Sequence, residues 1–347
     1  WIAWSPIRSR SNSLRVLLIK TSSLGDVIHT LPALTDAARA IPGIQFDWVV
    51  EEGFAEIPTW HPAVARVIPV ALRRWRKNLL QTWKSGEWAT FKQRLREGRY
   101  DLVIDAQGLL KSALLTRYVN APVAGLDRAS AREPLASRCY DRPYAVAWGQ
   151  HAVERVRQLF AQALGYPLPQ SVGDYGLDRG AMAGEAAAEP YVLFLHGTTW
   201  ASKHWPEADW RALAEHLDSR GLAVRLPWGS ELEKARAERI VAGLQHASVL
   251  PKLNLRGVAA VIAGARACVA VDTGLGHLAA ALDVPSISLY GPTLPLKVGA
   301  YGRGQVHLCA TGPLAGGGDR HQPCFDGLDA ARVAPELDRL LASLESH

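Results

Sequence analysis

Short apolar runs alternate with amphipathic stretches along most of the chain, and this alternation restricts the possible folds more than any other feature. The run LRVLLIK at 14–20 is almost continuously apolar, as expected for a strand that is buried on both faces of a sheet. Strands and helices in alternation predict a parallel sheet covered by helices on both faces. Further β-rich runs follow at 46–50, 66–70, 101–105 and 122–126, and helical patterns at 26–40 and 111–119.

The same alternation starts again after 167–190, a stretch rich in Gly, Pro and Ala that is typical of a linker. We therefore expect an α/β protein of two Rossmann-like, doubly wound units, residues 14–170 and 185–347, that face a central cleft. The last helix, expected at about 329–344, is compatible with packing on either unit. The second series comprises runs at 191–196, 207–220, 222–229, 231–244, 254–265, 267–274, 275–282 and 285–291.

Length and composition fit two globular domains without a membrane span. The 347 residues exceed one typical domain, and 48% hydrophobic with 21% charged residues argues against disorder. No apolar run approaches the roughly 20 residues that cross a bilayer. Residues 1–13 are interrupted by arginines, so we expect a disordered extension outside the fold. Four widely spaced cysteines without a CxxC pair predict reduced thiols of a cytosolic protein: Cys139, Cys268, Cys309 and Cys324.

Positive charge is concentrated between Arg66 and Arg99. This segment holds ten Lys or Arg and two Glu, a balance of +8, whereas the whole chain carries +6. A concentrated basic segment favours an anionic partner, and nucleic acid, anionic lipid and a phosphorylated substrate all fit. A solvated surface without a partner explains the same charges.

The run TSSLGDVIHTLPA at 21–33 follows the first predicted strand and suits a tight turn into a helix. Gly25 permits close backbone approach, and Asp26 falls at the start of the helix. At this position Asp26 fits an N-cap and a catalytic base, and the two roles are compatible because the helix dipole keeps the carboxylate ionised in both. The turn lacks GxGxxG and GxxxxGK[ST], so neither a dinucleotide fingerprint nor a P-loop is indicated.

Two polar turns follow strands of the second half and have features of phosphate-binding loops. Thr198, Thr199 and Lys203 precede a helix that begins at a proline, and hydroxyl groups with an ammonium group suit a diphosphate. The turn 272–274 opens another helix, and its amides could hold phosphate close to His277. A solvated polar loop and a structural histidine are the alternatives.

Glu231 follows LPWGS at the end of a further strand, where a carboxylate can accept hydrogen bonds from ribose hydroxyls. A glutamate that merely starts a helix fits equally well. No His, Cys or Asp cluster has the spacing of metal ligands, and no Asp-x-Asp pair is present. We therefore expect no metal and no cofactor, with leaving-group charge balanced by amides, helix dipoles and Lys203.

These motifs resemble those of glycosyltransferase family 9. The runs TSSLGDVIHTLPA, KHWP and DTGLGHLAAAL occur in the order of the family, and the match extends from about Leu14 to the last helix. The resemblance implies a GT-B fold with an N-terminal acceptor domain and a C-terminal donor domain. It also implies transfer of heptose from ADP-L-glycero-β-D-manno-heptose to a Kdo residue of Kdo-modified lipid A. The site of action would be the cytoplasmic face of the inner membrane, with peripheral membrane contact. Heptosyltransferase II or III activity is the nearest alternative.

The resemblance also assigns roles to individual residues. Asp26 matches the proposed base of the family, and Leu253 stands on the adenine side, where similar enzymes have Met. Trp200, in a run that departs from the family's usual one, has no assigned role. The donor contacts that carry over are Thr198, Thr199, Lys203, Glu231, Asp272, Thr273, Gly274 and His277.

The basic segment lies in the predicted acceptor half, and the implied acceptor carries phosphates and acyl chains. Arginine pairs with phosphate through two hydrogen bonds, and tryptophan favours the boundary between membrane and water. Trp75, Trp83 and Trp88 alternate with these charges, and we expect their side chains to lie at that boundary. The acceptor contacts that we expect are Arg73, Arg74, Arg76, Lys77 and Lys111.

Two other classes of protein fit parts of the pattern. A nicotinamide-dependent oxidoreductase has the same tandem architecture, but the missing GxGxxG argues against it. A nucleic-acid-binding protein would use the basic segment, and salt-sensitive binding of DNA or RNA would reveal it. The motifs favour the transferase and no nucleic-acid partner.

Overall fold

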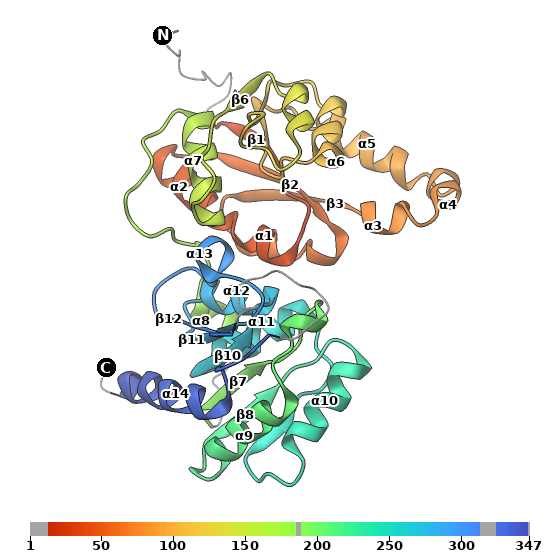
Figure 1. Ribbon diagram of the computed structural model, residues 1–347. Helices are drawn as coiled ribbons and strands as arrows, with labels where there is room; N and C mark the ends of the chain where they lie inside the picture. Colours follow the sequence, from red (N-terminus) through yellow and green to blue (C-terminus); the bar gives the residue numbers. More distant parts are fainter. Residues whose placement is uncertain (1–12, 185–188, 313–323, 346–347) are drawn as a thin grey trace. The chain divides into compact units, whose positions relative to one another are not determined.

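The computed structural model describes residues 13–184, 189–312 and 324–345 (Figure 1). The extension expected at 1–13 lies outside the described residues except for Ser13. The chain divides into two compact units, Trp1–Gly176 and Leu177–His347. Among the described helices, none is long and apolar enough to cross a membrane.

The first unit contains a sheet of six strands in the order β3-β2-β1-β4-β5-β6, and all its neighbours pair in parallel. The order reverses between β1 and β4, which creates the switch point where ligands bind in such sheets. The β1 residues Val16–Ile19 are fully buried, as the apolar run predicts. The strands are β1 Arg15–Ile19, β2 Gln45–Glu51, β3 Val64–Val70, β4 Leu102–Asp105, β5 Val123–Leu126 and β6 Arg142–Tyr144.

The helix predicted at 26–40 is in fact two helices, because Pro32 in the first turn of α2 has no N–H to continue the first one. The helix predicted at 111–119 is α6 followed by the 3₁₀ turn η3 (Leu114–Tyr118). The α-helices are α1 Leu24–Ile28, α2 Leu31–Ala40, α3 Leu72–Trp75, α4 Leu79–Lys84, α5 Glu87–Glu97, α6 Leu110–Ala113 and α7 Ala152–Leu164.

The second unit repeats the topology of the first. Its strand order is β12-β11-β10-β7-β8-β9, so β7 and β10 flank the switch point as β1 and β4 do in the first sheet. The strands are β7 Tyr191–Leu195, β8 Ala223–Leu226, β9 Ala247–Val249, β10 Ala267–Val271, β11 Ser286–Tyr290 and β12 Gln305–Cys309.

Helices cover this sheet too, and Trp205 packs edge-on against Trp210 with their ring centroids 5.0 Å apart in the core. The last helix, α14, packs against α9 of the same unit, where Asp338 lies 3.0 Å from His216. The α-helices are α8 Arg179–Ala183, α9 Glu207–Asp218, α10 Glu231–Val241, α11 Leu255–Gly264, α12 Gly274–Ala281, α13 Pro295–Val298 and α14 Ala330–Glu345.

Candidate active site

Asp26 lies in the first turn of α1, directly after the carboxyl end of β1. Its carboxylate accepts hydrogen bonds from the Ser23 amide at 2.8 Å and from the Ser23 hydroxyl at 2.9 Å. Ser23 is the N-cap and Asp26 the third helical residue of a capping box. Asp26 is therefore not the N-cap of α1, which is Ser23, three residues earlier. Asp26 nevertheless stabilises the helix start, as the second member of the capping box.

The surroundings of Asp26 keep its carboxylate ionised. Lys20, at the end of β1, places its ammonium group 3.8 Å from Asp26 and donates to the Ala106 carbonyl at 3.0 Å. Burial raises the pKa of the Asp26 carboxyl group, but Lys20 and Ser23 lower the pKa by more, and Arg132 lowers it further. The net pKa lies below the ordinary 3.8, so Asp26 is a carboxylate at neutral pH.

Asp26 remains accessible, since 36% of its side chain is exposed. Asp105, at the end of β4, is fully buried and accepts from Tyr140 at 2.8 Å and from Ser112 at 2.9 Å. Burial raises the pKa of Asp105, and its hydrogen bonds to Tyr140 and Ser112 give it a structural role. Of these two carboxyl groups at the switch point, only Asp26 is accessible, so only Asp26 can accept a proton from a ligand.

Three of the predicted acceptor contacts lie close together. Burial lowers the pKa of the Lys111 ammonium group, and the charges of Arg76 and Arg73 lower it further. Glu51 and Glu133 oppose this effect. Arg73 and Arg76 are exposed, and Lys111 in the first turn of α6 lies close enough for their charges to act on it.

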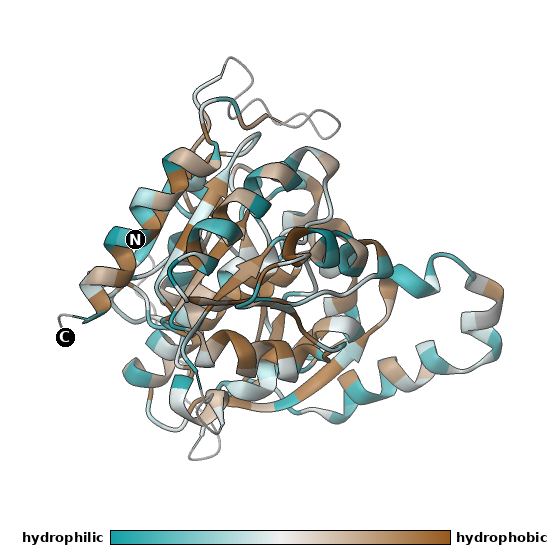
Figure 2. Ribbon diagram, turned by 90° about the horizontal axis from the view of Figure 1, so that it is seen from below, coloured by the Kyte–Doolittle hydropathy of each residue, from teal (hydrophilic) through white to brown (hydrophobic). Residues whose placement is uncertain are grey.

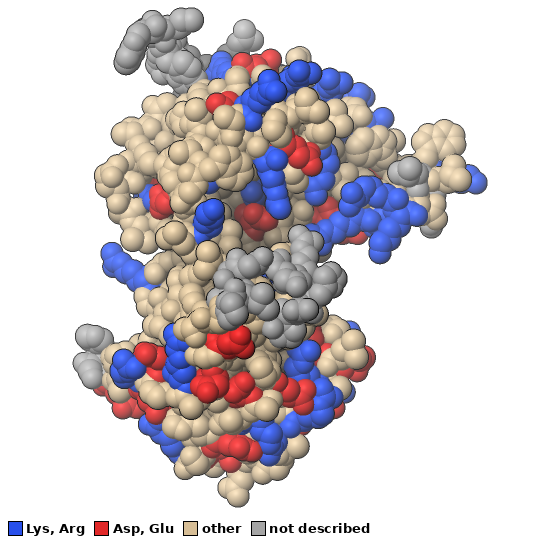
Figure 3. Space-filling view, in the orientation of Figure 1, with Lys and Arg blue, Asp and Glu red and all other residues tan. Residues whose placement is uncertain are grey.

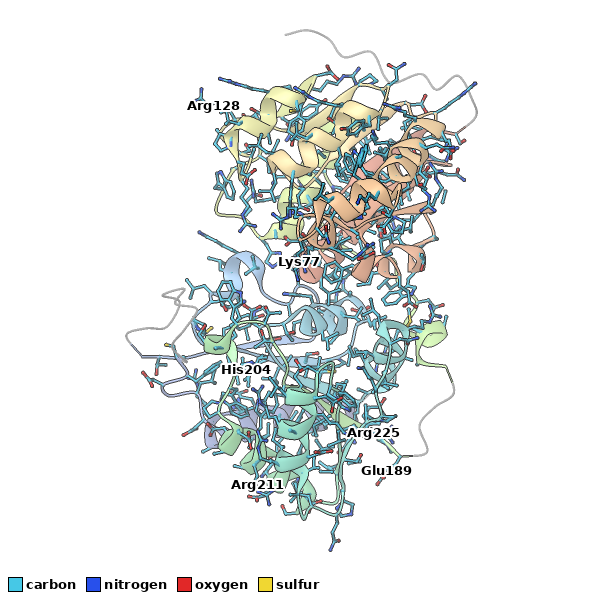
Figure 4. The ribbon with its side chains drawn as sticks, turned by 90° about the vertical axis from the view of Figure 1, so that its right-hand side faces the viewer. Lys77, Arg128, Glu189, His204, Arg211 and Arg225 are labelled. Atoms are coloured by element: carbon cyan, nitrogen blue, oxygen red, sulfur yellow. The ribbon has the colours of Figure 1, made fainter. Side chains whose placement is uncertain are left out.

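Arg74 is engaged differently from its neighbours. Its guanidinium pairs with Glu52 at 3.0 Å and with Glu87 at 2.8 Å, and Glu87 also accepts from the Trp75 indole at 2.7 Å. These pairs join α3 to α5. Lys77 is exposed at the end of the same stretch (Figure 4).

The expectation for the three tryptophans is wrong for two of them. Trp75 is buried, and its ring packs edge-on against Trp88 and Phe91 at 5.6 and 5.8 Å. Trp88 in turn contacts Tyr118. These rings pack inward because they complete the hydrophobic core beside the sheet of the first unit, and of the three tryptophans only Trp83 is exposed, at 78%.

In the second unit, Lys203 and Asp272 meet at the switch point between β7 and β10. The Lys203 ammonium group lies 2.7 Å from Asp272 Oδ2, which also accepts from the Thr293 hydroxyl at 2.8 Å. Thr198 donates to the main-chain carbonyl of Asp272 at 3.2 Å. Loops far apart in sequence thus place a cation and hydroxyl groups together.

The helix α12 begins beside this cluster. Thr273 is its N-cap in extended conformation, so the amides of Gly274 and the next residue point out of the helix start, as in anion-binding helices. His277 lies in the first turn, with Nε2 3.9 Å from Asp272 Oδ1. A Cβ at Gly276 would lie 3.2 Å from the Ala270 side chain, so glycine lets the helix pack close to β10.

The remaining donor candidates differ in position. Thr199 is exposed in the same loop as Thr198, and Leu253 is half-buried before α11. Glu231 is exposed as the first residue of α10, whereas Glu233 caps that helix. A Cβ built on Gly197 would lie 2.6 Å from Glu233 Oε1, so Glu233 adjoins the loop that carries both threonines.

Sequence reasoning missed several residues of these sites. Lys20 ends the first strand, and its position next to the TSSLGD turn was the available signal. Arg132 had none, because it lies 106 residues from Asp26 (132 − 26). Trp200 gains a role in the structure, since the Lys203 ammonium group lies 4.2 Å from its ring centroid. Among the described residues, no group of His, Cys, Asp or Glu could hold a metal ion.

Comparison with known proteins gives the same family as the motifs. The model of glycosyltransferase family 9 (heptosyltransferase) matches residues 88–324. The chain belongs to this family. Lipopolysaccharide heptosyltransferase 1 of Pseudomonas aeruginosa is 68% identical in an alignment of 353 positions. The alignment covers 96% of this chain and 99% of that protein. The heptosyltransferase 1 of Escherichia coli K12 is 54% identical, over 84% and 92% of the two chains.

Solved structures agree with the family assignment. E. coli heptosyltransferase WaaC with ADP superposes with a TM-score of 0.87 at 50% identity, covering 94% of this chain and all of that one. WaaC with ADP-2-deoxy-2-fluoro heptose gives 0.84. E. coli heptosyltransferase II, at 22% identity and a TM-score of 0.76, shares the fold. The predicted GT-B fold and glycosyltransferase class are confirmed.

Proposed function

We propose that this chain transfers L-glycero-D-manno-heptose from ADP-L-glycero-β-D-manno-heptose to a Kdo residue of Kdo-modified lipid A. The P. aeruginosa and E. coli K12 proteins named heptosyltransferase 1 support this reaction over that of heptosyltransferase II, because they are 68% and 54% identical to this chain, against 27% for the E. coli heptosyltransferase 2. The observation that carries the proposal is the exposed, ionised carboxylate of Asp26 at the switch point of the first unit.

In this mechanism Asp26 accepts the proton of an acceptor hydroxyl. The hydroxyl oxygen then forms a bond to the anomeric carbon of the heptose while the bond from that carbon to the ADP oxygen breaks. A single displacement inverts the anomeric centre, so a β-linked donor yields an α-linked product. The nearby Lys20 and Ser23 favour the carboxylate form and so hold Asp26 ready to accept the proton.

The second unit, Leu177–His347, is proposed to bind the donor. Lys203 balances the charge of the diphosphate, and the amides at the start of α12 bind its oxygens. Thr198, Thr199 and His277 complete the phosphate side. Leu253 is proposed to contact the adenine, and Thr273 and Gly274 belong to the helix start.

A ribose contact by a carboxylate of α10 is also proposed. Glu231 was the residue expected from the sequence, and it is exposed at the first position of the helix. Glu233 is the better placed of the two, because it adjoins Gly197 in the loop of the donor threonines. Asp272 is proposed to position Lys203, since their pairing at 2.7 Å holds the ammonium group at the switch point.

The first unit is proposed to bind the acceptor. Arg73, Arg76, Lys77 and Lys111 recognise its phosphates, and Arg74 stabilises the arrangement through its glutamate pairs. The acceptor is a membrane lipid, so the chain works at the cytoplasmic face of the inner membrane as a peripheral protein. Figure 3 shows many Lys and Arg side chains on the visible surface of the first unit.

One assay tests the proposal. The purified chain is incubated with ADP-heptose and three acceptors: Kdo-modified lipid A, the same lipid already carrying one heptose, and lipid A without Kdo. We expect transfer only to the first acceptor, with an α linkage in the product. Transfer only to the heptose-bearing lipid would instead identify a heptosyltransferase II, and no transfer to any of them would overturn the proposal.

A further inference from the structure

The helices α3, α4 and α5 form an arm that extends from the sheet of the first unit (Figures 1 and 2). Gly86 turns the chain between α4 and α5 in a left-handed conformation, with φ at +72°. The arm is held at its base by the rings of Trp75, Trp88 and Phe91 and by the Arg74 pairs. The arm is therefore folded, and its base belongs to the hydrophobic core of the first unit.

The tip of this arm is apolar and exposed. Leu80 is 75% exposed and Trp83 is 78% exposed, although Trp75 is buried and Trp88 is half-buried. The two residues are three apart on α4, so their side chains lie on the same face of the helix. This face, Leu80 with Trp83, is called the tip pair below.

Positive charges border the tip pair on both sides in sequence. Lys77 precedes α4 and Lys84 ends it, and both are exposed. Neither lysine forms an ion pair with another residue in the described part of the chain. An apolar pair flanked by lysines matches the chemistry of an anionic bilayer surface, where indole rings settle at the interface and ammonium groups meet lipid phosphates.

We propose that the tip pair inserts into the interface of an anionic membrane, with Lys77 and Lys84 bound to the headgroups. The arm then anchors the first unit beside the lipid that carries the acceptor. This inference rests on the proposed function in one respect, which is that a membrane-embedded acceptor brings the chain to a bilayer. Membrane binding itself can be measured without any transfer reaction.

The test uses the full chain and co-sedimentation with vesicles that contain phosphatidylglycerol, compared with vesicles of phosphatidylcholine alone. We expect the wild type to bind the anionic vesicles and the double variant Leu80→Ala/Trp83→Ala to bind about tenfold more weakly or less. Lys77→Gln/Lys84→Gln should weaken binding about fivefold per lysine at low salt. The matched control is Leu232→Ala/Leu296→Ala, which removes two leucines that are 83% and 76% exposed in the other unit.

A second readout separates anchoring from chemistry. The tip-pair variant should keep wild-type kinetics with a deacylated, water-soluble Kdo acceptor and lose activity only on acceptor embedded in vesicles. The inference is overturned if the wild type does not bind anionic vesicles, or if the tip-pair variant binds like the control. It is also overturned if the variant only abolishes self-association in sedimentation, because the tip then contacts a second copy. If the chain transfers heptose to none of the acceptors, the proposed function is wrong. The vesicle measurement still tests whether the tip pair binds a membrane.

Discussion

In the first unit the loop after the first strand carries a carboxylate, whereas in the second unit the equivalent loop after β7 carries an ammonium group. Both sheets have the same strand order, so Asp26 and Lys203 occupy corresponding regions of one topology. Asp26 has a neighbouring lysine at 3.8 Å, and Lys203 has a neighbouring aspartate at 2.7 Å. We propose that one fold thus provides a site for proton transfer in the first unit and a site for phosphate in the second, and that the side chains at each switch point determine the difference.

Replacing the base should produce the largest effect. Asp26→Asn keeps the size of the side chain and its acceptor oxygen, but an amide cannot take a proton at neutral pH. We expect turnover to fall about 10²–10⁴-fold, the usual range for loss of a general base. The melting temperature checks that the variant is folded. Turnover within twofold of the wild type would remove Asp26 from the mechanism.

Each unit also contains a buried, neutral histidine, and these should respond to pH in the same way. Burial lowers the pKa of His61 to about 4, against an opposing effect of Asp174, and burial likewise lowers the pKa of His196 to about 4. Both begin from 6.5, so the unfolded chain binds more protons below pH 6.5. Stability should therefore fall as the pH drops from 6.5 and level off below 4.

The expected loss is about 2 kcal/mol per histidine at pH 5, from the difference between the two pKa values. Urea unfolding between pH 7 and pH 5 measures it, and His61→Gln and His196→Gln should each remove part of the slope. His61 accepts from the Ala63 amide at 3.1 Å, which leaves Nε2 to donate to Thr35. An unfolding free energy independent of pH over this range would refute the neutral state of both rings.

In the second unit, Lys203→Ala should weaken ADP binding by about tenfold, because a charged hydrogen bond to phosphate is lost. Calorimetric titration of ADP measures the affinity, and added EDTA should leave it unchanged. Lys234→Ala is the matched control, since that lysine lies 3.8 Å from Glu238 on the same helix. Equal affinities for the two variants would remove Lys203 from the donor site, and a requirement for Mg²⁺ would contradict binding without a metal.

The acceptor contacts should give the smallest effect, since exposed charges are screened by salt. Neutralising Arg73, Arg74, Arg76 and Lys77 together should raise the acceptor KM several-fold at low salt, with ADP affinity unchanged. The control variant also loses four positive charges from the basic segment, but at Lys92, Arg94, Arg96 and Arg99. If both sets raise the KM equally, the effect is general attraction and α3 has no specific role.

The sequence was enough to predict the parallel sheets and most turns at the switch points, because buried central strands and glycine-rich turns leave strong local patterns. The short strands β6 and β9, three residues each at one edge of their sheets, were missed because so few residues leave no periodicity. The helix α7 was also missed. Its Arg157 is 1% exposed and pairs with Asp36 at 2.6 Å, so a charged residue occupies a buried face that the pattern alone marks as exposed.

The side-chain pairs of the site could not be predicted from local patterns. The 2.7 Å pair of Lys203 and Asp272 joins residues 69 positions apart (272 − 203), and only the strand order brings them together. The choice between Glu231 and Glu233 depended on which helical position faces the neighbouring loop. Residues two positions apart on a helix differ by about 200° in direction, so Glu231 and Glu233 face nearly opposite sides and only one of them can face that loop.

The ADP affinity of Asp26→Asn shows whether the first unit carries out proton transfer while the second unit alone binds the donor. Calorimetric titration of one preparation gives the dissociation constant, and turnover is measured on the same sample. We expect a dissociation constant within about twofold of the wild type, together with turnover reduced at least about 100-fold. An ADP affinity that falls about tenfold, as expected for Lys203→Ala, would contradict it, because Asp26 would then contribute to donor binding.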